Sequence, residues 1–294
     1  MKLVWFLFLF LICTYADGQE KSLNELEHLT KEAINVMKTD KNYENRKTAF
    51  EAVGNNLKQA FSLKGSYQHN FAALEGISML KSPDNKFKLF TWELFENDST
   101  YTYGGIIQLE NGKFIVLNDK SAEMLQIPFT SLNEKKWYGV LYYKIIPFKH
   151  KNATMYAVLG FDSFSFFARR KLVDILYFEG DKVRFGAPVF DFGKRKSEKA
   201  NRRFLITYSV EAKVRMSWDE QFQGIVFDNL IWGADSRGVP AMVTDGTYSI
   251  LKYDDKKQQW VYEEDIFKNA PNLINGEAPI FQPKTKSDGL FRPK

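Results

Sequence analysis

The sequence predicts a mainly β fold: an antiparallel meander, either a curled sheet or a partly closed barrel, preceded by an N-terminal helical hairpin. From about Gly76 onward, apolar and polar residues alternate with a period of two, which is typical of strands. Short turns join these runs, and they require antiparallel neighbours because parallel strands need long crossovers. Aromatic residues make up 16% of the chain, and they favour the half-buried surface of a sheet.

The first residues indicate an export signal. Lys2 precedes a nearly unbroken apolar run over 3–13, much shorter than the ~20 residues that a membrane-spanning helix needs. Small residues at Ala16 and Gly18 suit cleavage, so we predict a signal peptide over 1–18, with a cut after Ala16 as the alternative. A buried N-terminal helix or strand is the competing interpretation of the same run.

Cys13 is the only cysteine, and it lies inside this leader. A lipoprotein anchor at Cys13 is disfavoured because Ile12 occupies the position where that signal has a small residue. Without the leader the chain has no cysteine for disulfides, zinc–thiolate sites or nucleophilic catalysis. No later apolar run reaches spanning length, so we expect no transmembrane segment in a mature protein of the periplasm, the cell surface or the medium.

Two helices are predicted over 22–37 and about 40–61, within a hairpin that spans 19–66. Ser22 and Glu25 have capping-box spacing at the start of the first helix. Apolar residues recur at steps of three and four, which gives each helix one apolar face to bury. These residues are Leu23, Leu26, Leu29, Ala33, Ile34 and Met37 in the first helix, and Tyr43, Phe50, Val53, Leu57 and Phe61 in the second.

The β domain is predicted over 67–270, with about a dozen strands. Stretch 202–210 alternates most clearly, and the Asn111-Gly112 pair predicts a hairpin with a type I′ turn. Segments 87–95 and 137–146 are apolar on both faces, so both faces should be covered. A small propeller is the alternative, but no period of about 40 to 50 residues is present. Residues 271–294, rich in Pro, Gly and Asn, should form an extended tail.

Motifs for common chemistries are missing from the sequence. The three histidines, His28, His69 and His150, have no metal-ligand spacing, and no phosphate loop, dinucleotide fingerprint or Gly-x-Ser-x-Gly elbow is present. We therefore predict no metal and no cofactor. The net charge of +5 gives weak support to acidic partners or polysaccharides and none to nucleic acid.

Carboxylates remain as weak catalytic candidates, and we name Asp228 and Asp162. Asp228 directly follows three apolar residues, and a half-buried carboxylate costs free energy unless it is paired or hydrogen-bonded. A pair of carboxylates can hydrolyse a glycosidic bond. The competing interpretation of Asp228 is a structural ion pair or a turn cap.

Stretch 160–178 contains the ligand-binding candidates Phe164, Phe166, Arg169 and Arg170. Exposed aromatic rings beside cations suit sugar rings that carry acid groups, whereas buried edge packing is the alternative. Segment 191–203 is rich in cations. It predicts either a solvated loop or a patch for anionic glycans or lipid headgroups, formed by Lys194, Arg195, Lys196, Arg202 and Arg203.

The chain resembles a group of exported, β-rich proteins of Bacteroidota that have no assigned activity. The similar segments are KFKLFTWEL (86–94), GGIIQ (104–108), WYGVLYYKII (137–146), FGAPVF (185–190), IVFDNL (225–230) and DGTYSILKY (245–253). Members often have His after the Asp of the VFD motif, and Asn229 at that position argues against histidine-based catalysis. The resemblance implies a single β-rich module in the bacterial envelope.

We therefore expect an exported, non-enzymatic β protein that binds a partner or a cell-envelope component, with glycan as one candidate. The alternative is a carbohydrate-active hydrolase that uses a carboxylate pair including Asp228 or Asp162. The abundance of aromatic residues and the missing catalytic motifs favour the first hypothesis. The sequence itself indicates neither the ligand nor the oligomeric state.

Overall fold

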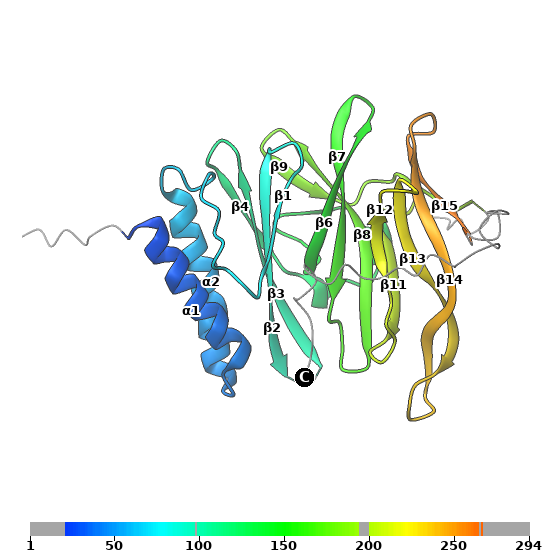
Figure 1. The fold of residues 1–294 in the computed structure, drawn as a ribbon, viewed down its shortest axis with the longest axis horizontal. Coiled ribbons are helices and arrows are strands. Elements are labelled where there is room, and N and C mark those ends of the chain that lie inside the picture. Colours follow the sequence, from blue (N-terminus) through cyan, green and yellow to red (C-terminus); the bar gives the residue numbers. More distant parts are fainter. Residues whose placement is uncertain (1–20, 98, 194–199, 265, 267–294) are drawn as a thin grey trace, which may run out of the picture.

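The computed structural model describes residues 21–97, 99–193, 200–264 and 266 (Figure 1). These residues form two helices followed by three sheets, and none of the sheets closes into a barrel. The prediction of a mainly β fold behind a helical hairpin is confirmed, although the strands divide among three sheets instead of forming one meander. The predicted signal peptide, 1–18, and the predicted tail, 271–294, lie outside the described residues.

Helices α1 (Leu23–Thr39) and α2 (Tyr43–Ser62) form the N-terminal hairpin. The Ser22 hydroxyl accepts a hydrogen bond from the Glu25 amide at 3.2 Å, so Ser22 caps α1 as its spacing predicts. The Asn42 side chain caps α2 by accepting from the Glu44 amide at 2.8 Å. Neither helix, nor any other in the described part of the chain, is long and apolar enough to cross a bilayer.

The first sheet is an antiparallel meander with the strand order β1-β2-β3-β4. The prediction of a hairpin at Asn111-Gly112 is confirmed. Its type is not I′, because only Gly112 of this pair has a positive φ, at 85°. The strands are β1 (Ser78–Lys81), β2 (Phe87–Asn97), β3 (Thr100–Leu109) and β4 (Phe114–Asn118).

The second sheet has the order β5-β9-β8-β7-β6, and β11 pairs with the first half of β8 while β9 pairs with its end. Two short 3-10 helices, η1 (Ser121–Glu123) and η2 (Ile127–Phe129), precede it. The strands are β5 (Leu132–Asn133), β6 (Leu141–His150), β7 (Ala153–Asp162), β8 (Ala168–Glu179), β9 (Lys182–Phe185) and β11 (Phe204–Ser209).

The third sheet has the order β10-β15-β14-β13-β12. Its β10–β15 pair is parallel, a departure from the predicted antiparallel pattern that involves two residues of each strand. The strands are β10 (Phe190–Asp191), β12 (Met216–Asp219), β13 (Gly224–Ala234), β14 (Pro240–Asp254) and β15 (Gln259–Glu263).

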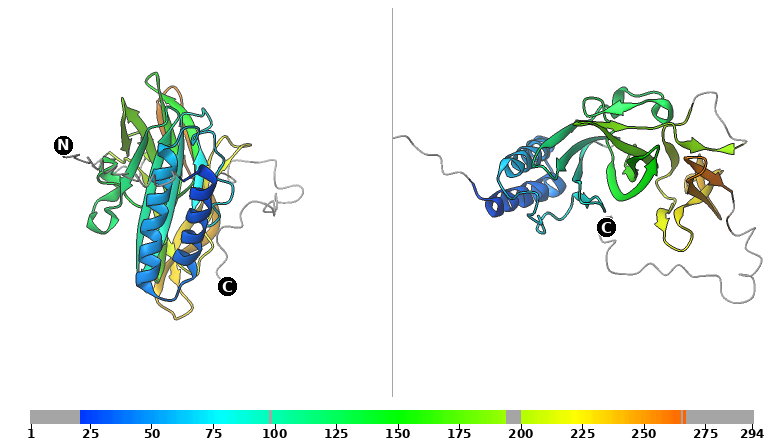
Figure 2. Two further views of the ribbon diagram at one scale, coloured as in Figure 1. Left: turned by 90° about the vertical axis from the view of Figure 1, so that its left-hand side faces the viewer. Right: turned by 90° about the horizontal axis from the view of Figure 1, so that it is seen from above.

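The helices and the three sheets follow one another along the long axis of the molecule, with a core between each successive pair (Figures 1 and 2). Phe90 and Trp92 of β2 pack toward the helices, whereas Phe87 and Leu89 pack toward the second sheet. Segment 87–95 is thus covered on both faces as far as Leu94, as predicted, whereas Phe95 at its end is exposed. The second sheet is likewise buried between the other two, which explains why 137–146 is apolar on both faces except at the exposed Lys144.

Candidate functional site

One end of the molecule collects exposed apolar side chains from three connections. The β7–β8 loop, the β11–β12 turn and the β13–β14 hairpin all project at the lower end of Figure 1. The Val210 amide donates to the Phe167 carbonyl at 2.9 Å, and the Ser236 amide donates to the Glu211 carboxylate at 2.8 Å, so the three connections touch. We call this end the aromatic tip and define it by Phe164, Phe166, Phe167, Val210, Ile231, Trp232 and Val239, all exposed.

The phenylalanines of the tip are presented in a fixed arrangement. Phe166 and Phe167 are 54% and 53% exposed, and their rings meet edge to face with centroids 4.9 Å apart. The Arg237 guanidinium lies 4.2 Å from the Phe167 ring centre. Phe164 has a φ of 46°, which is uncommon outside glycine and turns the loop sharply at this residue. The alternative of buried edge packing is therefore wrong for Phe166 and Phe167.

Arg169 and Arg170 hold the loop in place. Arg169 donates to the carbonyls of Ser163 at 2.9 Å, Ala168 at 3.1 Å and also Ser165. Arg170 lies 3.3 Å from the Phe164 ring centre and donates to the Tyr138 hydroxyl at 3.0 Å. These two cations thus position the aromatic side chains, and much of their donor capacity is used inside the protein.

Asp162 lies beneath the loop in a hydrogen-bonded network. Its carboxylate accepts from the Tyr103 hydroxyl at 2.9 Å, from the Phe164 amide at 2.8 Å and from the Tyr138 hydroxyl. Burial raises the pKa of both tyrosines, so they stay protonated and can donate. Burial also raises the pKa of Asp162, and the hydrogen bonds to its carboxylate oppose that shift.

Glu93 of β2 joins the same network from the first sheet. The Ser163 hydroxyl donates to its carboxylate at 2.8 Å, while the Ser163 amide donates to the Tyr103 hydroxyl at 2.8 Å. Burial raises the pKa of Glu93, and the neighbouring Asp162 raises it further. The network therefore ties the first sheet to the β7–β8 loop through two carboxylates.

Asp228 occupies a different place, a groove of about 300 Å³ between β11 and the β13–β14 pair. Its carboxylate accepts from the Arg215 amide, and burial raises its pKa. Among the residues that line this groove Asp228 is the one carboxylate, and Glu93 and Asp162 are not among them. Lys171 lies close enough to lower the pKa of Asp228, and burial lowers the pKa of Lys171 to about 8.

The predicted basic patch needs a correction. Arg203 is 1% exposed and forms a buried ion pair with Asp174 of β8, with 3.1 Å between Nε and Oδ2. Arg203 therefore belongs to the interior and not to a surface patch. Arg202 is half-buried and donates to the Gly186 carbonyl at 3.1 Å. Lys194, Arg195 and Lys196 lie outside the described residues.

Sequence reasoning missed Glu93, Tyr138 and Trp232. Glu93 is the one acidic residue of 87–95, a segment predicted to be covered on both faces, and that placement was the signal for a buried acid that needs partners. Trp232, 74% exposed, follows Ile231 in an apolar strand and gave no comparable signal. Within the described residues, no group of three or more His, Cys, Asp and Glu side chains is arranged to hold a metal ion.

No protein-family model, curated protein or solved structure matches the chain. The functional argument therefore depends on the geometry of the chain itself.

Proposed function

We propose that this chain is an exported, non-enzymatic binding protein that holds a protein partner at the aromatic tip. The observation that supports the proposal most is that the β7–β8 loop, with its three exposed phenylalanines, and the β13–β14 hairpin, with the exposed Trp232, project at the same end of the molecule. Monomeric soluble proteins rarely gather large exposed apolar side chains in one region unless that region binds something. Aromatic side chains and arginine are also the residues that dominate binding energy at protein interfaces.

The rigidity of the tip supports the same proposal. Arg169 binds three carbonyls of the loop, and the Asp162 carboxylate receives the Phe164 amide. A loop that is already ordered loses little conformational entropy when a partner binds, so more of the contact energy remains as affinity. The partner would need apolar pockets that receive Phe166, Phe167 and Trp232.

Glycan binding at this tip has less support than protein binding. Sugars stack on flat, open aromatic faces, whereas Phe166 and Phe167 meet edge to face at an interplanar angle of 83°. Much of the donor capacity of Arg169 serves the loop itself, and that of Arg170 serves Tyr138 and Thr207. The hydrolase alternative also has little support, because Asp228 lines its groove without a second carboxylate, and Glu93 and Asp162 lie outside that groove.

Photo-crosslinking in the cells that make the protein tests this proposal. A photoreactive phenylalanine analogue at position 166 should give one discrete crosslinked protein of higher mass. The same analogue at Leu125, which is 97% exposed but lies outside the tip, should not give it. Combining the analogue at 166 with Trp232→Ser should reduce the yield without changing the melting temperature, because Trp232 is a surface residue.

Three outcomes would overturn the proposal. One is the absence of a crosslinked product at position 166, and another is an equal yield from position 125. The third is a product that is only a dimer of this chain or only a polysaccharide conjugate, each of which mass spectrometry distinguishes from a second protein.

A further inference from the structure

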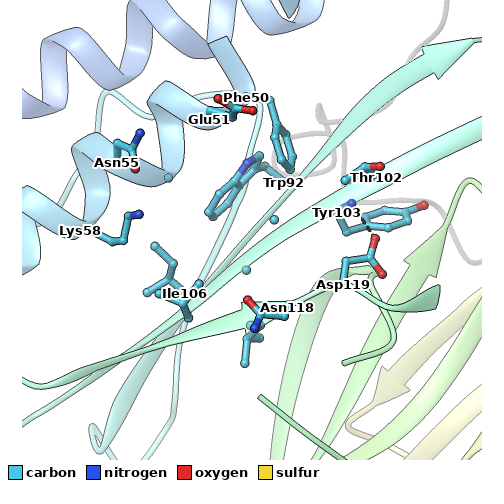
Figure 3. A pocket seen from close by; sticks show the side chains of 15 residues that line it. Phe50, Glu51, Asn55, Lys58, Trp92, Thr102, Tyr103, Ile106, Asn118 and Asp119 are labelled. Atoms are coloured by element: carbon cyan, nitrogen blue, oxygen red, sulfur yellow. Dashed lines mark hydrogen bonds between the residues drawn. The ribbon is translucent and has the colours of Figure 1, made fainter. Parts of the chain in front are cut away.

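The face of the first sheet that carries the helices is only partly covered by them. A groove of about 490 Å³ lies there between α2 and strands β3 and β4 (Figure 3). That volume lies within the range of small-molecule sites. The groove involves different elements from the aromatic tip, so a ligand bound in it is independent of the proposed protein partner.

The floor of the groove lacks a side chain at the centre of β3, where Trp92 fills the space instead. Gly104 pairs with Trp92 of β2, and the indole of Trp92 lies across it. A Cβ at position 104 would lie 2.1 Å from the indole, so only glycine fits there. Beside this bare stretch of backbone, Ile106 and Val116 provide an apolar floor.

Trp92 carries a polar atom without a partner on the wall of this groove. The residue is 3% exposed, and its indole N–H has no hydrogen-bond acceptor among the described residues. A buried N–H that has lost water and gained no acceptor costs free energy, so such groups are rare unless they serve a purpose. The indole N–H of Trp260 also lacks an acceptor, but Trp260 lines neither this groove nor the groove that contains Asp228.

The rim of the groove carries both hydrogen-bond donors and acceptors, and they lie on α2 and on the strands opposite it. Glu51, Asn55 and Lys58 project from one side of α2 at steps of four and three, and Thr102 and Asn118 lie across from them (Figure 3). Glu51 and Lys58 carry opposite charges. Asp119 also lines the groove, but its carboxylate already accepts from the amides of three residues, Tyr103, Ser121 and Gly139.

We propose that this groove binds a neutral saccharide unit. A sugar ring has an apolar C–H face that suits the exposed Val116, and hydroxyls that both donate and accept, which suits the mixed rim. One such hydroxyl supplies the acceptor that the Trp92 indole lacks once the side chains that cover this buried N–H shift aside. The balanced charge of Glu51 and Lys58 favours an uncharged ligand over an acidic one.

Titration of the 15N-labelled protein tests this assignment through the tryptophan indole resonances. The probes are cellobiose, maltose and N-acetylglucosamine, with glucuronic acid as the charged comparison. We expect at least one neutral probe to shift the Trp92 resonance saturably while the Trp260 resonance stays unchanged. Asn55→Ala with Asn118→Ala, both at exposed positions, should weaken that binding about tenfold through the loss of two hydrogen bonds.

Val116→Trp provides a second variant that fills the groove from an exposed strand position and should abolish the shift. Trp92→Phe serves only to assign the resonance. The proposal is overturned if no neutral probe shifts Trp92 at concentrations about tenfold above a millimolar Kd. It is equally overturned if the shift survives in the groove variants, if only glucuronic acid binds, or if the indole is satisfied by a bound water that no probe displaces.

Discussion

Two buried aspartates on the second sheet are stabilised in opposite ways. Asp174, fully buried in the middle of β8, forms a direct ion pair with Arg203, whose Nη1 group donates to the carbonyls of Ile127 and Thr130. Asp162, at the end of β7, accepts its hydrogen bonds from neutral donors, and Arg170 donates to Tyr138 while its charge opposes the burial-raised pKa of Asp162.

The two aspartates also connect different parts of the molecule. The Asp174–Arg203 pair connects β8 to the segment around η2 across the interior, and Gly186 is required beside it because a Cβ there would lie 2.7 Å from the guanidinium. The Asp162 network instead connects two sheets to a surface loop. We infer that the ion pair holds the segment around η2 against β8 in the interior, whereas the hydrogen-bonded network determines the shape of the aromatic tip.

The largest effect is expected from breaking the ion pair. Asp174→Leu or Arg203→Met leaves one charge buried and unpaired, which should cost about 3–5 kcal/mol of unfolding free energy. The double variant Asp174→Leu/Arg203→Met removes both charges and should recover most of that loss. Urea denaturation of the three variants measures this. A loss in the double variant that equals the sum of the two single losses would show that the two residues are not coupled.

Asp162→Asn should have an intermediate effect. An amide cannot accept all three hydrogen bonds as a carboxylate does, so we expect a loss of about 1–3 kcal/mol. The β7–β8 loop should also lose order, which faster amide exchange at Phe164 would reveal. Tyr138→Phe is the matched control, since it removes one donor and should cost less. If the amide exchange rates of the loop are unchanged in Asp162→Asn, the network does not determine the shape of the aromatic tip.

Glu93→Gln should give the smallest effect, and it should depend on pH. Because burial raises the pKa of Glu93 in the folded state, the native protein binds this proton more tightly than the unfolded chain does. Stability from this group is therefore complete below the unfolded pKa, about 4.3, and is lost as pH rises through the folded pKa.

Glutamine resembles the protonated acid and still accepts from Ser163, so Glu93→Gln should match the wild type at about pH 4 and exceed its stability at neutral pH. Paired urea midpoints at the two pH values test this. A variant that is less stable than the wild type at both pH values would contradict the expected sign.

Much of the architecture could be predicted because it follows from local pattern. The stripe from Leu26 to Met37 gives the buried face of α1, and the Ser22 cap marks its first turn. Segment 87–95 is apolar on both faces because it lies between two cores. The spacing of apolar residues is a property of short stretches of sequence, so helices and strands can be predicted from it without knowing the fold.

The pairing of distant residues could not be predicted in the same way. Arg203 and Lys196 look alike in a cation-rich stretch, yet Arg203 reaches a carboxylate that lies 29 residues earlier in the chain. The division into three sheets also depends on which strand faces pack together, and period alone does not contain that information.

The sequence by itself determined the helical hairpin, the succession of strands and the apolar character of the central layer, because local hydrophobic pattern fixes which backbone geometry can bury its side chains. Only the tertiary structure decided that Glu93 meets the loop after Asp162, that Arg203 is interior and that Trp92 lines a groove with an unpaired N–H. These outcomes depend on contacts between residues far apart in the chain. Such contacts contribute free energy only after the helices and the sheets have packed together.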